Sequence, residues 1–400
     1  MNREPGMVIS PPFPNNYANE FLELDHGKGV WLFDTSGKKY LDFGSGISVN
    51  ALGYGRKDLA KIAMKQMEKL IHVSNVYTTA PAVALAQKLT GLRGFSAVHF
   101  GNSGTEANEA ALKYARMYSL RKKGEGSHKL LSFSNAFHGR TMGSLSVTPT
   151  DTYRKPFEPL IPGCEVLPFN DVEKLESTLD SSFAAVIVEP LQGEGGLNLM
   201  TQDFAKALNR LCREHDVVLI ADEIQTGLGR LGEVFGSDLV GLNPDIITLS
   251  KPLAGGLPLS ATLIPEKINE LLNVGEHGTT FGGGPVTTAV ALKIVETVTA
   301  PRFLADVKEA SSCLEDRLEE LAAAYETVGG RYGAGMLQGI SITGKVPAGD
   351  VILRCREKGL LVLKSGKDRI RIAPPLIISE KEIEHGVAII EKVLKEIEGT

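Results

Sequence analysis

The sequence predicts an α/β protein: a large domain with a mostly parallel central sheet sandwiched by helices, plus a smaller α+β domain. Three observations favour this class. Between about residues 56 and 300, short apolar runs alternate with helical patterns, as in parallel sheets with right-handed crossovers. After residue 300 the alternation stops, and a long helical pattern precedes several β-prone runs. The 400-residue chain is 42% hydrophobic, which is enough for a large core.

The expected elements follow one another along the chain. The first 30 residues, rich in Pro, Asn and Gly, predict an irregular arm, and residues 29–43 predict a hairpin with a Ser-Gly turn. Buried strands are expected at the apolar runs 97–100, 130–133, 184–188, 217–221, 245–249 and 259–264. Helices are expected at 105–122, 203–214, 303–325 and from 380 onward, and further β-prone runs at 337–342, 359–364 and 368–373. We therefore predict an arm with part of the small domain at 1–55, a large cofactor-binding domain at 56–300, and a C-terminal small domain at 301–400.

Charge and cysteine usage exclude several classes of protein. The net charge of −5 argues against a nucleic-acid-binding protein, which usually has a basic face. The four cysteines are scattered and have no metal-ligand spacing, so we expect reduced thiols and no metal site. No apolar run reaches 18 residues, and the N-terminus lacks the pattern of a secretion signal. These features predict a cytoplasmic protein that does not bind a membrane.

Polar residues follow the predicted strands at one edge of the sheet. In open α/β sheets, ligands bind beyond the carboxyl ends of the strands. The residues at these ends are the turn 101–105, the loop 134–140, Glu189, the pair 222–223 and the pair 250–251. Their convergence predicts a ligand pocket at this edge.

Three features of the pocket fit one cofactor. Ser103, with Glu106 three residues later, predicts a capping box at a helix N-terminus, where free amide groups can bind phosphate, although a plain helix cap is the alternative. Asp222 ends a buried strand and needs a cationic partner, which a protonated pyridine nitrogen would supply. Lys251 follows another buried strand and could form a Schiff base. Together these needs describe pyridoxal 5′-phosphate. Phe137 could stack on its ring, although an aromatic residue after a strand is more often part of the core.

Two alternatives from other classes stay open at this point. The strand ending in Asp222 also resembles the magnesium strand of P-loop NTPases, which would make the protein a nucleotide-hydrolysing module. The nearest match to a phosphate loop, residues 339–345, lacks the following Ser or Thr and falls in the small domain. This alternative predicts that function survives without Lys251. A catalytically inactive scaffold would instead hold no chromophore.

A series of motifs, in the expected order, resembles the class-III (subgroup II) aminotransferases, which are pyridoxal-phosphate-dependent transferases of fold-type I. The motifs are YLDFGSGISVNALG, GNSGTEANEAALKYAR, FHGRTMGSLSVT, VEPLQGEGG, LIADEIQTGLGR, LSKPLAGGLPLSA, TTFGGGP and RIRIAPPL. The resemblance runs from about residue 25 to the C-terminus and is greatest to acetylornithine aminotransferases. It implies ping-pong transfer of the δ-amino group of N-acetyl-L-ornithine to 2-oxoglutarate, giving N-acetyl-L-glutamate 5-semialdehyde and L-glutamate in arginine biosynthesis. Ornithine, 4-aminobutyrate, N-succinylornithine and N-succinyl-diaminopimelate are the alternative donors.

The resemblance also implies roles for individual residues. Lys251 would hold the cofactor and move the proton, while Asp222 would keep the ring nitrogen protonated. Thr280 would reach the cofactor phosphate of the partner subunit, which implies a homodimer with shared active sites. The implied cofactor-binding residues are Ser103, Gly104, Thr105, Phe137, Asp222, Gln225, Lys251 and Thr280.

The substrate-binding roles implied by the resemblance concern five residues. Arg140 would grip the substrate α-carboxylate, and Thr279 would lie near the substrate. Arg371 would switch between Glu194 and the second carboxylate of 2-oxoglutarate, although a static ion pair is the alternative. Gly46 stands where ornithine δ-aminotransferases carry a tyrosine, which leaves room for an acyl group; a simple turn glycine is the alternative.

Three positions depart from the family pattern. Tyr54 stands in place of a usual histidine-containing stretch, Pro252 follows the lysine in place of a small residue, and Gly284 replaces a common asparagine. Pro252 is compatible with an extended strand end before it. Gly284 could alter the loop that carries Thr279 and Thr280, and with it the substrate specificity.

Overall fold

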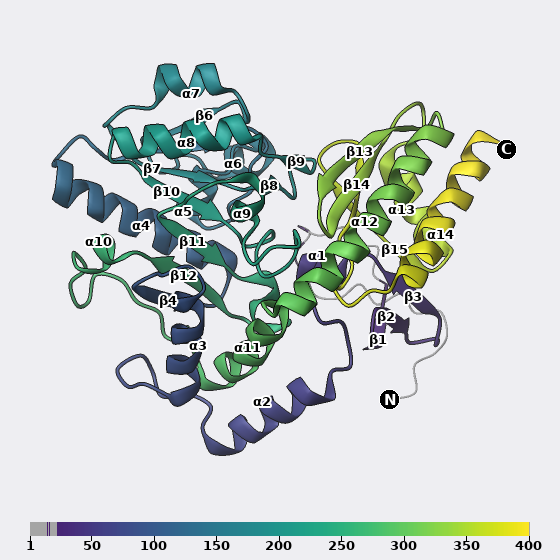
Figure 1. Ribbon diagram of the computed structural model, residues 1–400, viewed down its shortest axis with the longest axis horizontal. Coiled ribbons are helices and arrows are strands. Elements are labelled where there is room, and N and C mark those ends of the chain that lie inside the picture. The colour runs from purple at the N-terminus through teal and green to yellow at the C-terminus, as the bar shows by residue number, and fades with distance from the viewer. Residues whose placement is uncertain (1–13, 15, 17–21, 400) are drawn as a thin grey trace.

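The computed structural model describes residues 14, 16 and 22–399 (Figure 1). Most of the predicted N-terminal arm therefore lies outside the described residues. Where the arm is described, the prediction of irregular chain is wrong at its end, because β1 (Leu24–Lys28) pairs antiparallel with β2 (Trp31–Asp34). The β1 strand is largely exposed and has no alternating apolar pattern, so the sequence gives no strand signal there. Its backbone hydrogen bonds to β2 stabilise it. The predicted hairpin is confirmed, since β2 pairs antiparallel with β3 (Lys39–Asp42).

A seven-stranded sheet forms the centre of the larger part of the molecule. In spatial order its strands are β4 (Ala97–Gly101), β12 (Ser260–Ile264), β11 (Ile246–Leu249), β10 (Val218–Asp222), β7 (Phe183–Val188), β5 (Lys129–Phe133) and β6 (Cys164–Leu167). Within this sheet β12 runs antiparallel to its neighbours and the other strands share one direction. All the apolar runs predicted as strands in this region are confirmed, whereas the edge strand β6 was not predicted.

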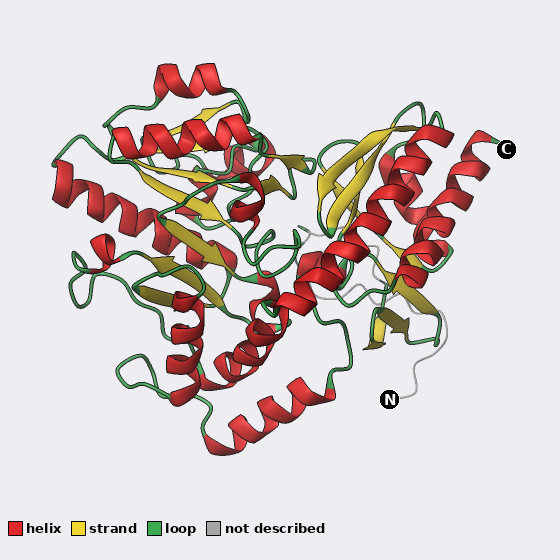
Figure 2. Cartoon of the chain, viewed as in Figure 1, coloured by secondary structure: helices red, strands yellow, loops and turns green. Residues whose placement is uncertain are grey.

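Helices cover both faces of this sheet (Figure 2). Along β10, Val218 and Ile220 enter one apolar cluster with α4 (Gly104–Lys123), and Leu219 and Ala221 enter another with α8 (Gln202–Glu214). The second cluster also contains residues of α3 (Ala80–Gly91) and α11 (Pro285–Val298). Such two-sided burial explains why the strands read as unbroken apolar runs. The arrangement is that of fold-type I.

The smaller part combines N-terminal and C-terminal segments. One sheet has the order β13 (Val328–Ala334), β14 (Leu337–Ile342), β17 (Arg369–Ile372) and β16 (Leu363–Ser365), and β15 (Leu360–Leu361) pairs parallel with β3. Helices α12 (Pro301–Ala324), α13 (Ala348–Glu357) and α14 (Glu380–Glu398) share a separate apolar core with these strands. The two cores agree with a two-domain division, and the boundaries at residues 55 and 300 stay a prediction.

The P-loop alternative finds no support in the smaller part. Residues 339–342 belong to β14, a buried strand paired on both sides, so they do not form a phosphate-binding loop, although α13 begins at Ala348, shortly after Lys345. In the described part of the chain, no helix is long and apolar enough to span a membrane. Likewise, residues 22–399 contain no cluster of three or more His, Cys, Asp or Glu side chains placed to hold a metal ion.

The remaining helix α2 and several short elements complete the chain. They are α1 (Ser45–Ser48), α2 (Lys57–Lys69), α5 (Met142–Ser146), α6 (Asp151–Arg154), η1 (Lys155–Phe157), α7 (Val172–Thr178), β8 (Leu191–Gln192), β9 (Asn198–Leu199), α9 (Gly236–Val240), η2 (Lys251–Ala254) and α10 (Glu266–Asn269).

Candidate active site

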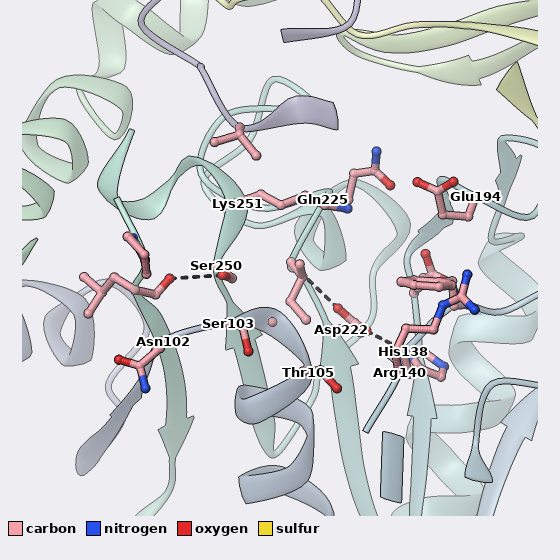
Figure 3. Close-up of a pocket in the computed structure, with 18 of the residues that line it drawn as sticks. Asn102, Ser103, Thr105, His138, Arg140, Glu194, Asp222, Gln225, Ser250 and Lys251 are labelled. Atoms are coloured by element: carbon pink, nitrogen blue, oxygen red, sulfur yellow. Dashed lines mark hydrogen bonds and ion pairs between the residues drawn. The ribbon is translucent and has the colours of Figure 1, made fainter. Parts of the chain in front are cut away.

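A cavity of about 570 Å³ lies at the carboxyl ends of the parallel strands, where the sequence predicted a ligand site (Figure 3). The structure brings most of the predicted site residues to its wall. The lining residues that were predicted are Ser103, Gly104, Thr105, Phe137, Arg140, Glu194, Asp222, Gln225 and Lys251.

One end of the cavity is suited to an anion. The predicted capping box is confirmed: Ser103 Oγ accepts from Glu106 N at 3.4 Å, and the Glu106 carboxylate accepts from Ser103 N at 3.1 Å. The amides of Gly104 and Thr105, in the first turn of α4, have no acceptor within the helix and can donate to a ligand. A Cβ at Gly104 would come within 2.8 Å of the Ile224 side chain, so only glycine allows this close packing of helix start and loop.

Asp222, at the end of β10, is buried and fixed by three donors. Its Oδ2 lies 2.8 Å from His138 Nδ1 and 2.8 Å from Asn108 Nδ2, and its Oδ1 accepts from Ile224 N at 3.1 Å. The sequence analysis expected the cofactor to be the only partner of the Asp222 carboxylate. It did not identify His138 and Asn108 as further partners. The His138 side chain is fully buried, and its Nε2 has no hydrogen-bond partner among the described residues. The geometry therefore fixes one carboxylate at the cavity wall in a single orientation.

Lys251 begins η2, two residues after the last residue of β11, and is partly buried. Burial lowers the pKa of the Lys251 amine, and Arg371 lowers it further, whereas Glu194, Asp222 and Glu189 oppose the shift. A lowered pKa increases the fraction of neutral amine, which is the nucleophilic and basic form.

Two of the three departures from the family pattern, Pro252 and Gly284, are accommodated by the backbone. The extended strand end expected before Pro252 is not found, because Lys251 already belongs to η2. Pro252 lies in the first turn of η2, where a missing amide proton costs nothing. Gly284 is the N-cap of α11, and a Cβ there would meet Phe281 O at 3.5 Å, which is ordinary contact. An asparagine side chain at Gly284 would therefore begin without a clash.

Glu189, whose role the sequence left open, links two loops of the site. Its Oε1 accepts from Phe137 N at 3.0 Å, and its Oε2 accepts from Gly193 N at 3.3 Å. Burial raises the pKa of Glu189 to about 7; nearby His138 counteracts this and Asp222 adds to it. Glu189 thus positions the backbone on either side of the cavity.

Arg371 and Glu194 form the predicted pair. Arg371 Nη1 lies 2.5 Å from Glu194 Oε1 and also donates to Gly193 O at 3.2 Å. The Arg371 side chain is only 3% exposed, whereas that of Glu194 is 34% exposed. Arg371 Nε is buried without a hydrogen-bond partner among the residues that the structure describes. The structure thus contains the ion pair between Arg371 and Glu194. The switch of Arg371 from Glu194 to a carboxylate of 2-oxoglutarate stays a prediction.

Arg140 lies at the exposed side of the cavity and is stacked on aromatic rings. Its guanidinium carbon is 3.4 Å from the centroid of the Tyr153 ring and 5.5 Å from that of Phe137. Stacking holds the guanidinium plane while leaving its edge, which carries the donors, free for a carboxylate. The supporting role of Tyr153 was not predicted, because only the fold brings it under Arg140.

Besides Arg371, three predicted residues do not line the cavity of this chain. Gly46 is exposed and has a φ of 64°, in the left-handed region that favours glycine. Thr279 Oγ1 accepts from Asn102 Nδ2 at 3.3 Å, close to the cavity rim. Thr280 is exposed and lies instead in a small hollow beside residues 72–79. Their predicted roles stay predictions.

The fold and this set of side chains define a class of enzyme, the aminotransferases. Residues 13–394 match the family model described as aminotransferase class-III, and the chain belongs to this family. It is 40% identical to an acetylornithine aminotransferase, described as mitochondrial, from Debaryomyces hansenii; the match covers 98% of this chain and 86% of that protein.

Two solved structures are similar over nearly the whole chain. The ornithine aminotransferase of Toxoplasma gondii has a TM-score of 0.92 at 30% identity, covering 96% of this chain and 93% of its own. The acetylornithine aminotransferase of Elizabethkingia anophelis has a TM-score of 0.85 at 33% identity, covering 96% of both chains.

Proposed function

We propose that this protein is a pyridoxal-5′-phosphate-dependent aminotransferase that moves the δ-amino group of N-acetyl-L-ornithine to 2-oxoglutarate. The products would be N-acetyl-L-glutamate 5-semialdehyde and L-glutamate, which places the reaction in arginine biosynthesis. The observation that carries the proposal is the cavity itself, which Lys251 and Asp222 line together with an anion-binding helix start and an arginine. The 40% identity to an acetylornithine aminotransferase over nearly the full chain supports the choice of donor.

The residues present fit pyridoxal phosphate. The first-turn amides of α4 offer a phosphate site, with the Thr105 hydroxyl beside them. The Asp222 carboxylate, fixed by His138 and Asn108, matches a protonated ring nitrogen, and Phe137 offers a flat apolar face at the same cavity. When bound, this cofactor acts as an electron sink for the carbon atom that loses a proton.

Each protein group would then have a defined task. Lys251 would hold the cofactor covalently until the amino group of the substrate takes its place on the cofactor. The amine of Lys251, released by this exchange, would then remove the proton from the substrate carbon that carries the reacting nitrogen. Asp222 would hold the proton on the ring nitrogen. Gln225, whose Nε2 donates to Ser48 Oγ at 3.2 Å, would contact the ring hydroxyl.

The two arginines would distinguish the two half-reactions. Arg140 would bind the α-carboxylate of the donor as a planar fork. N-Acetylornithine has no second carboxylate, so Arg371 can stay paired with Glu194 while this donor reacts. 2-Oxoglutarate carries two carboxylates, and the second would displace Glu194 from Arg371. Glu194 is the more exposed partner and therefore the one that can move.

An exposed apolar surface supports a homodimer. Val76, Tyr77 and Phe281 are 81%, 72% and 68% exposed, and Ile71 is 60% exposed. Tyr77 and Phe281 border the same hollow as Thr280. Covering this surface with a second copy would remove apolar area from water and bring Thr280 toward the partner's cavity. We propose this dimer, and a cytoplasmic location, as part of the function.

The proposal is tested by steady-state kinetics with a panel of donors. L-Glutamate formation from 2-oxoglutarate is measured with N-acetylornithine, ornithine, 4-aminobutyrate, N-succinylornithine and N-succinyl-diaminopimelate. We expect the highest kcat/KM for N-acetylornithine. A higher value for another donor would contradict the substrate and leave the reaction class intact, whereas no glutamate from any donor would contradict the class.

A further inference from the structure

Four consecutive residues beside the cavity have a left-handed backbone. The φ angle is 43° at Ser45, 64° at Gly46, 63° at Ile47 and 64° at Ser48. Glycine adopts this region freely, but a β-branched residue such as Ile47 is strained there. Strained backbone persists only where neighbouring groups hold it. The contacts of this turn therefore decide its position.

The Asp42 carboxylate holds the start of the turn. Its Oδ1 accepts from Gly44 N at 2.8 Å and from Ser45 N at 3.0 Å, and its Oδ2 accepts from the Tyr54 hydroxyl at 2.5 Å. Asp42 is only 3% exposed, so its oxygens depend on these donors. Burial and the neighbouring Asp42 raise the pKa of Tyr54, so the hydroxyl keeps its proton at neutral pH.

The rest of the turn is tied to the remainder of the chain. Ser45 Oγ donates to Ala373 O at 2.6 Å, which connects the turn to the segment after β17. Asn50 Nδ2 lies 3.3 Å from the Tyr54 hydroxyl and 3.4 Å from Ser45 O. The Tyr54 hydroxyl is thus shared between Asp42 and Asn50, and both of these contact Ser45.

The end of the turn contacts the active site. Ser48 is fully buried, and its Oγ accepts from Gln225 Nε2 at 3.2 Å. The next residue, Val49, lines the cavity, as Gln225 does. A shift of the turn would therefore move the hydrogen-bond partner of Gln225 and a part of the cavity wall together.

We propose that Tyr54 is a positioning residue for the active site. Its hydroxyl fixes Asp42, and through Asp42 it holds the turn Ser45–Ser48 against Gln225 and the cavity wall. Tyr54 does not line the cavity and acts only through these neighbours. The inference rests on the proposed function in one respect, the contact of Gln225 with the ring hydroxyl of the cofactor.

The test compares Tyr54→Phe with a matched control, Tyr40→Phe. Tyr40 also donates to a carboxylate in the N-terminal segment, Asp34 Oδ2 at 3.0 Å, which lies outside the turn and does not accept from it. Two properties of the holoenzyme are measured without substrate: amide hydrogen exchange of peptides covering residues 44–50, and the pH midpoint of the change in visible absorbance. Tyr54→Phe should speed exchange in this segment about tenfold, as expected for a lost hydrogen bond to a carboxylate. It should also shift the absorbance midpoint, and Tyr40→Phe should change neither property.

Two further variants test the path of the effect. Asp42→Asn replaces the carboxylate that accepts from the Tyr54 hydroxyl by an amide, so the charge-assisted hydrogen bond is lost and a donor NH₂ group faces either the hydroxyl or the turn amides. This variant should reproduce both changes, even if Tyr54→Phe folds poorly. In a Ser48→Ala background, which lacks the acceptor for Gln225, Tyr54→Phe should add no further absorbance shift.

Unchanged exchange and absorbance in Tyr54→Phe and in Asp42→Asn would overturn the proposal, and additive absorbance shifts would overturn the path through Ser48. Both readouts are recorded without an amino donor. A wrong donor assignment would therefore leave them standing, and the two failures can be told apart.

Discussion

Replacing Asp222 by asparagine removes a charge from the site and keeps the shape of the side chain. In the structure His138 Nδ1 and Asn108 Nδ2 each lie 2.8 Å from Oδ2, and Ile224 N lies 3.1 Å from Oδ1. An amide offers one oxygen and one NH₂ group, so at least one of these donors would face another donor in the variant. We therefore expect the free energy of unfolding of the cofactor-free protein to fall by about 1–3 kcal/mol.

The effect on the reaction should exceed the effect on stability. Two unit charges about 4 Å apart interact by about 4 kcal/mol at an effective dielectric constant of about 20. Each loss of about 1.4 kcal/mol in transition-state stabilisation lowers the rate tenfold. If Asp222 keeps the ring nitrogen charged, Asp222→Asn should lower kcat/KM by about three orders of magnitude.

The assay measures kcat/KM for N-acetylornithine in cofactor-saturated enzyme, with visible absorbance as proof of loading. Asp245→Asn is the matched control, because Asp245 Oδ2 accepts from Leu219 N at 3.0 Å and Oδ1 lies 2.7 Å from Lys267 Nζ, at the amino end of β11. Asp245→Asn should lower the free energy of unfolding, because these two interactions are weakened. It should keep kcat/KM within about twofold, because they lie near the surface and far from the cavity. A loaded Asp222→Asn enzyme with kcat/KM within tenfold of the wild type would refute the electrostatic reasoning.

Four further predictions concern other parts of the site. Lys251→Ala should abolish the covalently held cofactor, seen as loss of the visible band after gel filtration; an unchanged band would contradict its role. Arg140→Ala should raise KM for both the donor and 2-oxoglutarate by about tenfold or more, because a charged hydrogen bond to each carboxylate is lost; unchanged values for both would place carboxylate binding elsewhere. Burial raises the pKa of Glu189 to about 7, so the folded protein retains a proton that the unfolded chain loses above its ordinary pKa of 4.5, and stability should fall by about 3 kcal/mol as the pH rises through this interval. Urea unfolding of Glu189→Gln should show a smaller fall, and an equal fall in both proteins would assign the pH dependence to other groups. Gly46→Tyr should lower kcat/KM for N-acetylornithine more than for ornithine, whereas equal losses would show that this glycine does not set specificity.

The central sheet could be predicted because its strands are buried on both faces. In β10, Val218 and Ile220 face one core while Leu219 and Ala221 face the other, so no polar residue interrupts the run. The strands that were missed lack this signal. β6 lies at the sheet edge and is partly exposed, and β13 contains three glycines and an arginine. Backbone pairing with a neighbouring strand, which leaves no local pattern, holds both of them.

The site residues that lie at the carboxyl end of a buried strand could be predicted from the sequence. Asp222 and Lys251 each stand at the end of an apolar run, and parallel strands bring such ends to one edge. The partners of Asp222 could not be found in this way, because His138 and Asn108 are 84 and 114 residues away in sequence. Asn108 lies within a long helix and resembles any other helical polar residue.

Two further contacts between side chains were equally hidden. Tyr54 was noticed only as a departure from the family pattern, and its hydrogen bond to Asp42 depends on how the segment after the N-terminal hairpin folds back. Arg371 and Glu194 were paired through the resemblance alone, since 177 residues separate them. Long-range pairs of this kind require the fold, whereas local patterns suffice for the strand ends.

The most direct test of the proposed function is a single half-reaction followed by visible absorbance. The purified holoenzyme is mixed with N-acetylornithine in the absence of 2-oxoglutarate, and parallel samples receive ornithine or 4-aminobutyrate at the same concentration. We expect the visible band to be lost fastest with N-acetylornithine and to return when 2-oxoglutarate is added, with release of L-glutamate. A band that N-acetylornithine leaves unchanged, while the cofactor is demonstrably bound, would contradict the proposed function.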